Sequence, residues 1–280
     1  MIPPKNVMVC AVKSDRIVRA AKYIASIFSN AVYHIVAVIP RYNARYFLTS
    51  LYSRTLKRIA EEAIYDLEIA LAEHRVLSMR SAILEGKPAN ELLDYAKKHN
   101  VDLVVLTAAA SPSPIVRVVG SVTRSFIRYS KSVVFVHPMT ITSIHIPPKI
   151  SRILFVSRAR VPSEVYDRAL KLTIHIAKSF NSEIVVAHVI KHEEEEKLLN
   201  TIKSHLSQEN IRFSIDVLRP KSRDEEVELI LELAKYVDVS IQIRAHGIIA
   251  RVSKILPFWT RSLMPCEIVA GLSTVPIFFV

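Results

Sequence analysis

The stretch Leu84-Glu85-Gly86-Lys87-Pro88-Ala89-Asn90-Glu91 marks a passage from a strand to a helix. The apolar run Val76 to Leu84 has the length of a strand, and Pro88 suits the first turn of a helix because the N–H that proline lacks would be unpaired there. The helix is expected to end near Asn100, and Asp102 to Thr107 forms the next buried strand. Two buried strands joined by a helix are typical of a parallel sheet that helices cover.

The same alternation extends outward over the first half of the chain. Short apolar runs predict further strands, and segments with apolar residues at intervals of three and four predict helices. The strands are expected at Val7 to Val12, Tyr33 to Ile39 and Val133 to Val136, and the helices at Asp15 to Phe28, about Ala44 to His74, and from near Gly120. The order βαβαβαβαβ predicts a doubly wound, five-stranded α/β domain over residues 1–138.

The second half repeats this scheme. Ile153 to Val156 matches the first strand, and Arg168-Ala169-Leu170-Lys171 matches Arg19-Ala20-Ala21-Lys22. Further matches pair Phe180 to Ile190 with Phe28 to Ile39, and Glu228 to Asp238 with Glu91 to Asp102. The proline-bounded segment between them has no helical period, which predicts a linker over residues 139–149. An internal duplication therefore places a second, diverged domain at residues 150–280.

Composition limits the class of protein. Hydrophobic residues make up 50% of the chain and charged residues 23%, which indicates a folded protein. The net charge is +12, and the first 150 residues carry +10 of it, with 20 Lys and Arg against 10 Asp and Glu. Such a charge favours an anionic partner, namely a nucleotide phosphate, a nucleic acid or an acidic protein face, although a solvated basic surface explains it equally well.

Other sequence features indicate where in the cell the protein is located. The start of the chain lacks the features of a signal peptide, and its apolar stretches, such as Ile268 to Val280 with Pro276, fall short of a membrane span. Cys10 and Cys266 lack the spacing of a disulfide framework or zinc site. We therefore expect a cytoplasmic protein without a membrane span. The scarcity of glutamine beside abundant isoleucine and charge is thermophile-like.

The first half resembles the universal stress protein family over Asn6 to His137. The resemblance lies in Leu84 to Ala89, Leu92-Leu93-Asp94-Tyr95-Ala96, Val101 to Leu106, Gly120-Ser121-Val122-Thr123 and Ser132 to Val136. It implies two universal-stress-protein-like domains in tandem, the second degenerate, each with a doubly wound five-stranded parallel sheet of flavodoxin-like or Rossmann-like architecture. It also implies a ligand cleft at the carboxyl ends of the strands, where the strand order reverses.

Nucleotide-binding members of that family have a loop of the form G-2x-G-9x-G followed by Ser or Thr. Thr107 and Ala110 stand at the first two glycine positions here, whereas Gly120 and Ser121 match. Glycine lets the backbone approach a phosphate closely and present its N–H groups, and Pro112 and Pro114 remove two such donors. The site is therefore expected to be weakened.

Five further positions complete the predicted anion or nucleotide site: Val12, Lys13, Val38, Thr123 and Arg124. The helix that Gly120 to Thr123 opens attracts anions at its N-terminus, and Arg124 adds charge there. Val12 and Lys13 replace the Asp-Gly pair of the family's ATP-binding members, and Val38 borders the position of a base. In the second half Leu263-Met264 replaces the Gly-Ser pair, so no intact nucleotide site is expected there.

No catalytic or metal site is predicted. His246 has no nucleophile motif near it, and the acids after His192 suit the first turn of a helix better than a metal site. The preferred function is a non-enzymatic binding or regulatory role through protein contacts, with Val133 to Val136 pairing with Val275 to Val280. Two alternatives stay open: binding of ATP or AMP in the first-domain cleft, and nucleic-acid binding through a basic set on the last helix of the first domain, Arg117, Arg124, Arg128 and Lys131.

Overall fold

A computed structural model describes residues 3–41, 49–108, 120–138, 148–158, 161–190, 196–244 and 265–280. Residues 139–147 of the predicted linker lie outside these ranges, so the domain limits stay a prediction. The predicted helix start near Ala44 and the acids after His192 up to Glu195 also lie outside them.

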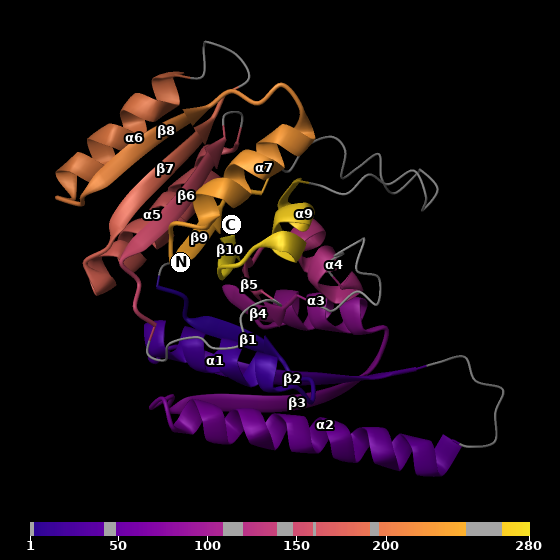
Figure 1. The fold of residues 1–280 in the computed structure, drawn as a ribbon. Helices are drawn as coiled ribbons and strands as arrows, with labels where there is room; N and C mark the ends of the chain where they lie inside the picture. The colour runs from indigo at the N-terminus through magenta and orange to yellow at the C-terminus, as the bar shows by residue number, and fades with distance from the viewer. Residues whose placement is uncertain are drawn as a thin grey trace.

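The first half contains the predicted alternation of strands and helices (Figure 1). Its elements are β1 (Asn6–Cys10), α1 (Asp15–Ile27), β2 (Val32–Pro40), α2 (Thr49–Ala72), β3 (Ser78–Gly86), α3 (Pro88–Lys98), β4 (Leu103–Thr107), α4 (Ser121–Tyr129) and β5 (Val133–His137). Pro88 occupies the first turn of α3, as predicted.

The second half repeats the order of elements. It contains β6 (Arg152–Arg158), α5 (Ser163–Phe180), β7 (Glu183–Val189), α6 (Glu196–Gln208), β8 (Phe213–Leu218), α7 (Arg223–Ala234), β9 (Val239–Gln242), α9 (Pro265–Leu272) and β10 (Ile277–Phe279). The duplication extends to hydrogen bonds. Asp102 Oδ2 accepts from the N–H groups of Lys5 and Asn6, and Asp238 Oδ2 accepts in the same way from Ser151 and Arg152.

The two five-stranded units join into one ten-stranded sheet with the order β3-β2-β1-β4-β5-β10-β9-β6-β7-β8. Within each half the strands are parallel, and the join between β5 and β10 is antiparallel, with Phe135 opposite Phe278. The predicted pairing of the last strands is therefore confirmed. Each half covers one edge of the other, and β3 and β8 remain at the ends of the sheet.

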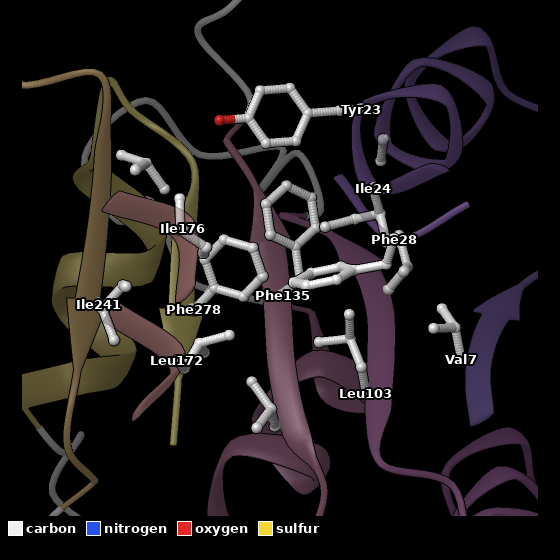
Figure 2. Close-up of a cluster of buried hydrophobic side chains, with 14 of the residues drawn as sticks. Val7, Tyr23, Ile24, Phe28, Leu103, Phe135, Leu172, Ile176, Ile241 and Phe278 are labelled. Carbon is white, nitrogen blue, oxygen red and sulfur yellow. The ribbon is translucent and has the colours of Figure 1, made fainter. Parts of the chain in front are cut away.

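Helices cover both faces of this sheet. One buried cluster lies under α1, α2, α5 and α6, and the other lies under α3, α4, α7 and α9. Figure 2 shows the first cluster at the join, where the rings of Phe135 and Phe278 lie 4.9 Å apart and Tyr23 stacks on Phe135 at 5.5 Å. The two halves therefore share one core across the join.

A polar contact between β2 and α3 interrupts the second cluster. His34 is 1% exposed, its Nδ1 lies 3.0 Å from the hydroxyl of Tyr95, and the ring of His99 lies 5.5 Å from its own. In the sheet, Met8 on β1 and Arg80 on β3 flank His34. Burial, His99 and Arg80 all lower the pKa of His34. The folded protein therefore favours the neutral imidazole.

Stability should fall as the pH drops below about 6.5, because the unfolded chain then binds a proton that folded His34 resists. One proton contributes a slope of at most about 1.4 kcal/mol per pH unit. His34→Gln should reduce the slope of the unfolding free energy between about pH 5 and pH 7, measured by urea unfolding. Equal slopes in His34→Gln and the unsubstituted protein would contradict this account.

Candidate functional site

The predicted site lies where the strand order of the first half reverses. Strands β1 and β4 are neighbours there, and the chain leads from β1 to β2 on one side and from β4 to β5 on the other. In open parallel sheets a crevice forms outside the carboxyl ends of two such strands. Helices α1 and α4 begin at this edge, because they follow β1 and β4 in the chain.

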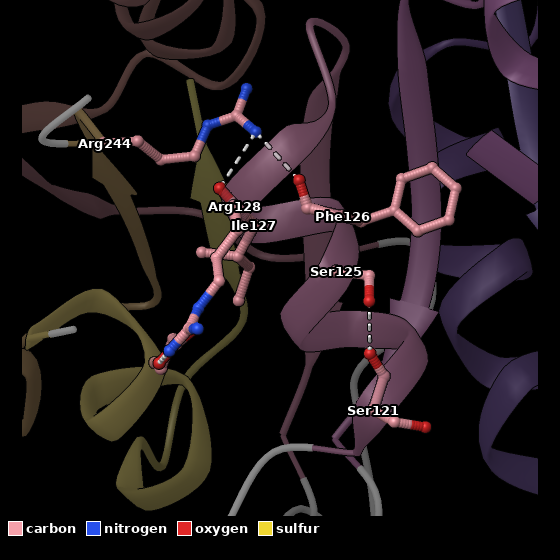
Figure 3. Close-up of polar contacts among 7 residues, drawn as sticks. Ser121, Ser125, Phe126, Ile127, Arg128 and Arg244 are labelled. Atoms are coloured by element: carbon pink, nitrogen blue, oxygen red, sulfur yellow. Dashed lines mark hydrogen bonds and ion pairs between the residues drawn. The ribbon is translucent and has the colours of Figure 1, made fainter. Parts of the chain in front are cut away.

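On the β4 side, the two ends of the predicted loop bind each other. The hydroxyl of Thr123 is buried and donates to the carbonyl of Thr107 at 3.2 Å. Gly120 caps α4 with φ of −55°, a conformation that does not require glycine. The side chain of Ser121 is exposed, and its carbonyl accepts from Ser125 (Figure 3). Ala110, Pro112 and Pro114 lie outside the described residues.

On the β1 side, Lys13 is bound to α2. Its Nζ lies 2.9 Å from Asp66 Oδ2 and 3.4 Å from Glu62 Oε2. The hydrogen bond to Asp66 is the main cause that raises the pKa of Lys13. Val12 is 52% exposed and therefore leaves the core at this edge. Half-buried Val38 packs against the core cluster under α3 and α4.

Arg124 shares a side of α4 with Arg128, which lies one turn further along. Arg128 forms an ion pair with Glu267 of α9, with 2.7 Å between Nη2 and Oε2. The Nε of Arg124 is buried and has no hydrogen-bond partner among the described residues. Arg124, which the sequence predicts as an anion-binding residue, therefore has a buried N–H group at the start of α4 that no described residue accepts.

The equivalent crevice of the second half, between β6 and β9, contains an internal arginine. Arg158 at the end of β6 donates from Nε to Glu226 on α7 at 2.9 Å and from Nη1 to the carbonyl of Ile243 at 2.8 Å. Both ion-pair partners are largely buried. The guanidinium of Arg158 therefore links the end of β6 to the end of β9, between which a ligand would enter.

A second buried arginine, Arg244, crosses from the second half to the first. It donates to the carbonyls of Phe126 and Ile127 at 3.1 and 3.4 Å (Figure 3). It also donates to the carbonyls of Ser130 and Ser132 at 3.0 and 2.8 Å. Burial lowers its pKa to about 10. Sequence reasoning missed Arg158 and Arg244, because a single arginine at a strand end has no local pattern that distinguishes it from a surface residue.

The model of the universal stress protein family matches residues 4–138. The first half of the chain belongs to the universal stress protein family. This agrees with the strand order, the reversal between β1 and β4 and the retained Gly120-Ser121 step at the start of α4.

Universal stress protein folds also cover the whole chain. A universal stress protein from Archaeoglobus fulgidus is 16% identical, with a TM-score of 0.74 over 98% of this chain and 95% of that one. The cytoplasmic domain of a prokaryotic cation chloride cotransporter is 12% identical, with a TM-score of 0.56 over 98% and 94%. A universal stress protein from Lactobacillus plantarum is 28% identical over 47% of this chain and 96% of its own, with a TM-score of 0.40. The two likenesses that extend over 98% of this chain confirm the tandem α/β fold.

No protein with a curated description matches this chain. Among the described residues, no helix is long and apolar enough to cross a membrane. The described ranges also contain no group of three or more His, Cys, Asp or Glu side chains arranged to hold a metal ion.

Proposed function

We propose that this protein is a cytoplasmic binding or regulatory protein without catalytic activity, which acts mainly through protein contacts. The nucleotide cleft of the first half is weakened, and that of the second half is lost. The hydrogen bond between Thr123 and Thr107 carries the proposal, because it joins the two ends of the predicted phosphate loop within the protein. A phosphate oxygen would have to compete for that hydroxyl.

The charges near Lys13 support the same proposal. The ammonium lies between the carboxylates of Glu62 and Asp66, and Glu62 also lies 3.6 Å from Arg58 Nε, so these four side chains carry no net charge. A polyphosphate approaching this side of the crevice would meet a paired ammonium rather than a free cation. Lys13 would bind it only after leaving Asp66.

In the second half, Arg158 supports the loss of the cleft. A ligand between β6 and β9 would have to displace a buried guanidinium from both Glu226 and the Ile243 carbonyl. Separating Arg158 from Glu226 would leave a buried charge without its counterion, which costs about 3–5 kcal/mol.

Adenine-nucleotide binding in the first half is the second candidate. The observation that favours it is the buried Nε of Arg124, near the start of α4 and unpartnered among the described residues. The first turn of α4 has no side-chain cap, and such a helix start favours anions.

Calorimetric titration with Mg-ATP and AMP at low and high salt separates these candidates. The protein is expected to give no binding heat in the micromolar range and to carry no nucleotide through purification, as measured by mass spectrometry. Micromolar affinity would overturn the proposal in favour of nucleotide binding under two conditions. The double variant Ser121→Ala with Thr123→Ala must abolish it, and the matched Ser125→Ala variant must retain it. Tight binding of mixed-sequence DNA with steep salt dependence would instead establish a nucleic-acid-binding protein.

A further inference from the structure

The outer side of α2 has a regular stripe of exposed residues. Its members recur at spacings of four and three, the heptad spacing that packs one helix against another, and they are Arg54, Arg58, Glu61, Tyr65, Glu68 and Ala72. Glu68 is half-buried and the other five are exposed. The opposite side of α2 packs on the sheet through Ala63, Ile64, Leu67 and Leu71. Figure 1 shows α2 along the outer margin of the molecule, beside the edge strand β3.

Charges along this stripe are separated by sign. The basic residues Arg54 and Arg58 occupy its first part, the acidic residues Glu61 and Glu68 its second, and Tyr65 lies between the two acids. The ion pairs that these charges form within α2 have long N–O distances. Arg58 Nε lies 3.6 Å from Glu62, and Lys57 Nζ lies 3.9 Å from Glu61. Such exposed pairs stabilise little and can rearrange when a partner binds.

We propose that this stripe is a self-association surface, and that its occupant is α2 of a second copy of this chain lying antiparallel. In antiparallel helix pairs each a position faces a d position. One register then places Arg58 against Glu68 of the second copy, Glu61 against Tyr65, and Arg54 against Ala72. Two-fold symmetry forms each contact twice. A parallel arrangement would instead set like charges side by side.

Exposed apolar surface supports the same occupant. Tyr65 is 63% exposed, and Ile69, one turn further along, is 44% exposed. The antiparallel pair would cover both rings of Tyr65 at its centre and give each hydroxyl a carboxylate acceptor on Glu61 of the other copy.

Helix α6 provides the internal comparison, because it follows β7 in the second half as α2 follows β2 in the first. It has 13 residues against 24 in α2. On its exposed side Lys203 lies between Asn200 and Ser207. The described side chains of α6 contain no opposing blocks of charge, so the proposed surface belongs to α2.

Sedimentation velocity of the full chain over a concentration series tests the proposal. The protein should dimerise at low salt and dissociate at about 0.5 M salt, where charges are screened beyond a few ångströms. Arg58→Glu sets two carboxylates against each other at two places and should weaken the dimer by about a hundredfold or more. Arg58→Glu with Glu68→Arg exchanges the charges and should restore dimerisation. Lys203→Glu is the matched control and should associate like the unsubstituted protein.

Three results would overturn the proposal. They are a monomer at low salt over the whole concentration series, a dimer that Arg58→Glu leaves intact, and failure of the exchanged double variant to recover association. Far-ultraviolet circular dichroism of each variant ensures that a loss of association is not a loss of fold. Sedimentation measures association without nucleotide, so calorimetry with Mg-ATP and this experiment can fail separately.

Discussion

Arg244→Met should lower the free energy of unfolding by about 3 kcal/mol or more. The side chain is 1% exposed and donates to four carbonyls at the end of α4 and the start of β5. Carbonyls at a helix end have few partners within the helix, so this arginine of the second half supplies donors to those of the first; of the four, Phe126 O also accepts from Ser130 N. Methionine fills similar space and removes the guanidinium donor from all four carbonyls.

Urea unfolding followed by circular dichroism measures this effect. Arg244→Lys should recover only part of the loss. An ammonium can donate to some of these carbonyls, but it cannot reach both Phe126 and Ser132 as a guanidinium fork does. Arg212→Met, at an exposed position next to β8, should change stability by less than about 0.5 kcal/mol. A midpoint for Arg244→Met equal to that of Arg212→Met would show that Arg244 contributes nothing to the joint between the halves.

Glu267→Gln should destabilise the protein by about 3–5 kcal/mol. The side chains of Arg128 and Glu267 are 9% and 1% exposed, and they form the buried ion pair between α4 and α9. Glutamine keeps the size of the side chain and removes its charge, so Arg128 remains buried without a counterion.

The double variant Arg128→Met with Glu267→Leu separates two explanations. If desolvation of an unpaired charge causes the loss, replacing both partners by apolar residues should recover most of the stability, because buried ion pairs are often no stronger than well-packed hydrophobic contacts. A double variant as unstable as Glu267→Gln in urea unfolding would instead show that the pair itself supplies the stability.

The order of the strands and helices was predictable from the sequence because each element has a local cause. Apolar runs such as Leu103–Thr107 become buried parallel strands, and Pro88 starts α3. The strand expected from Val76 begins at Ser78 instead. Arg75 has a φ of 60°, and the N–H of Val76 donates to the carbonyl of Leu71, so Val76 belongs to the cap that follows α2 rather than to β3.

The polar part of the site was less predictable. Motif spacing located Thr107, Gly120 and Thr123 at one edge of the sheet, but it could not show that the Thr123 hydroxyl already has an acceptor. The partners of Lys13 lie on α2, and the ion-pair partner of Arg158 lies on α7, far away in the chain. Such contacts arise when helices pack on the sheet, and no local pattern records them.

The ion pair between Arg128 and Glu267 also favours pairing of a first half with a second half over pairing of two first halves. Matching bonds align the two halves at this place, since Ser130 N donates to Phe126 O and Ser273 N donates to Val269 O. In that alignment Glu267 corresponds to Arg124, and Gly271 corresponds to Arg128.

Two first halves meeting through β5 in the same way would therefore bring Arg128 of each against Arg124 of the other, so that four guanidinium groups would gather where this chain places a carboxylate. Joining two unlike halves in one chain keeps them close and also gives each first half a partner of complementary charge. The first half of another copy would be a weaker partner, because its charges are alike. We therefore expect the first half to pair through β5 with the second half of its own chain rather than with the first half of another copy.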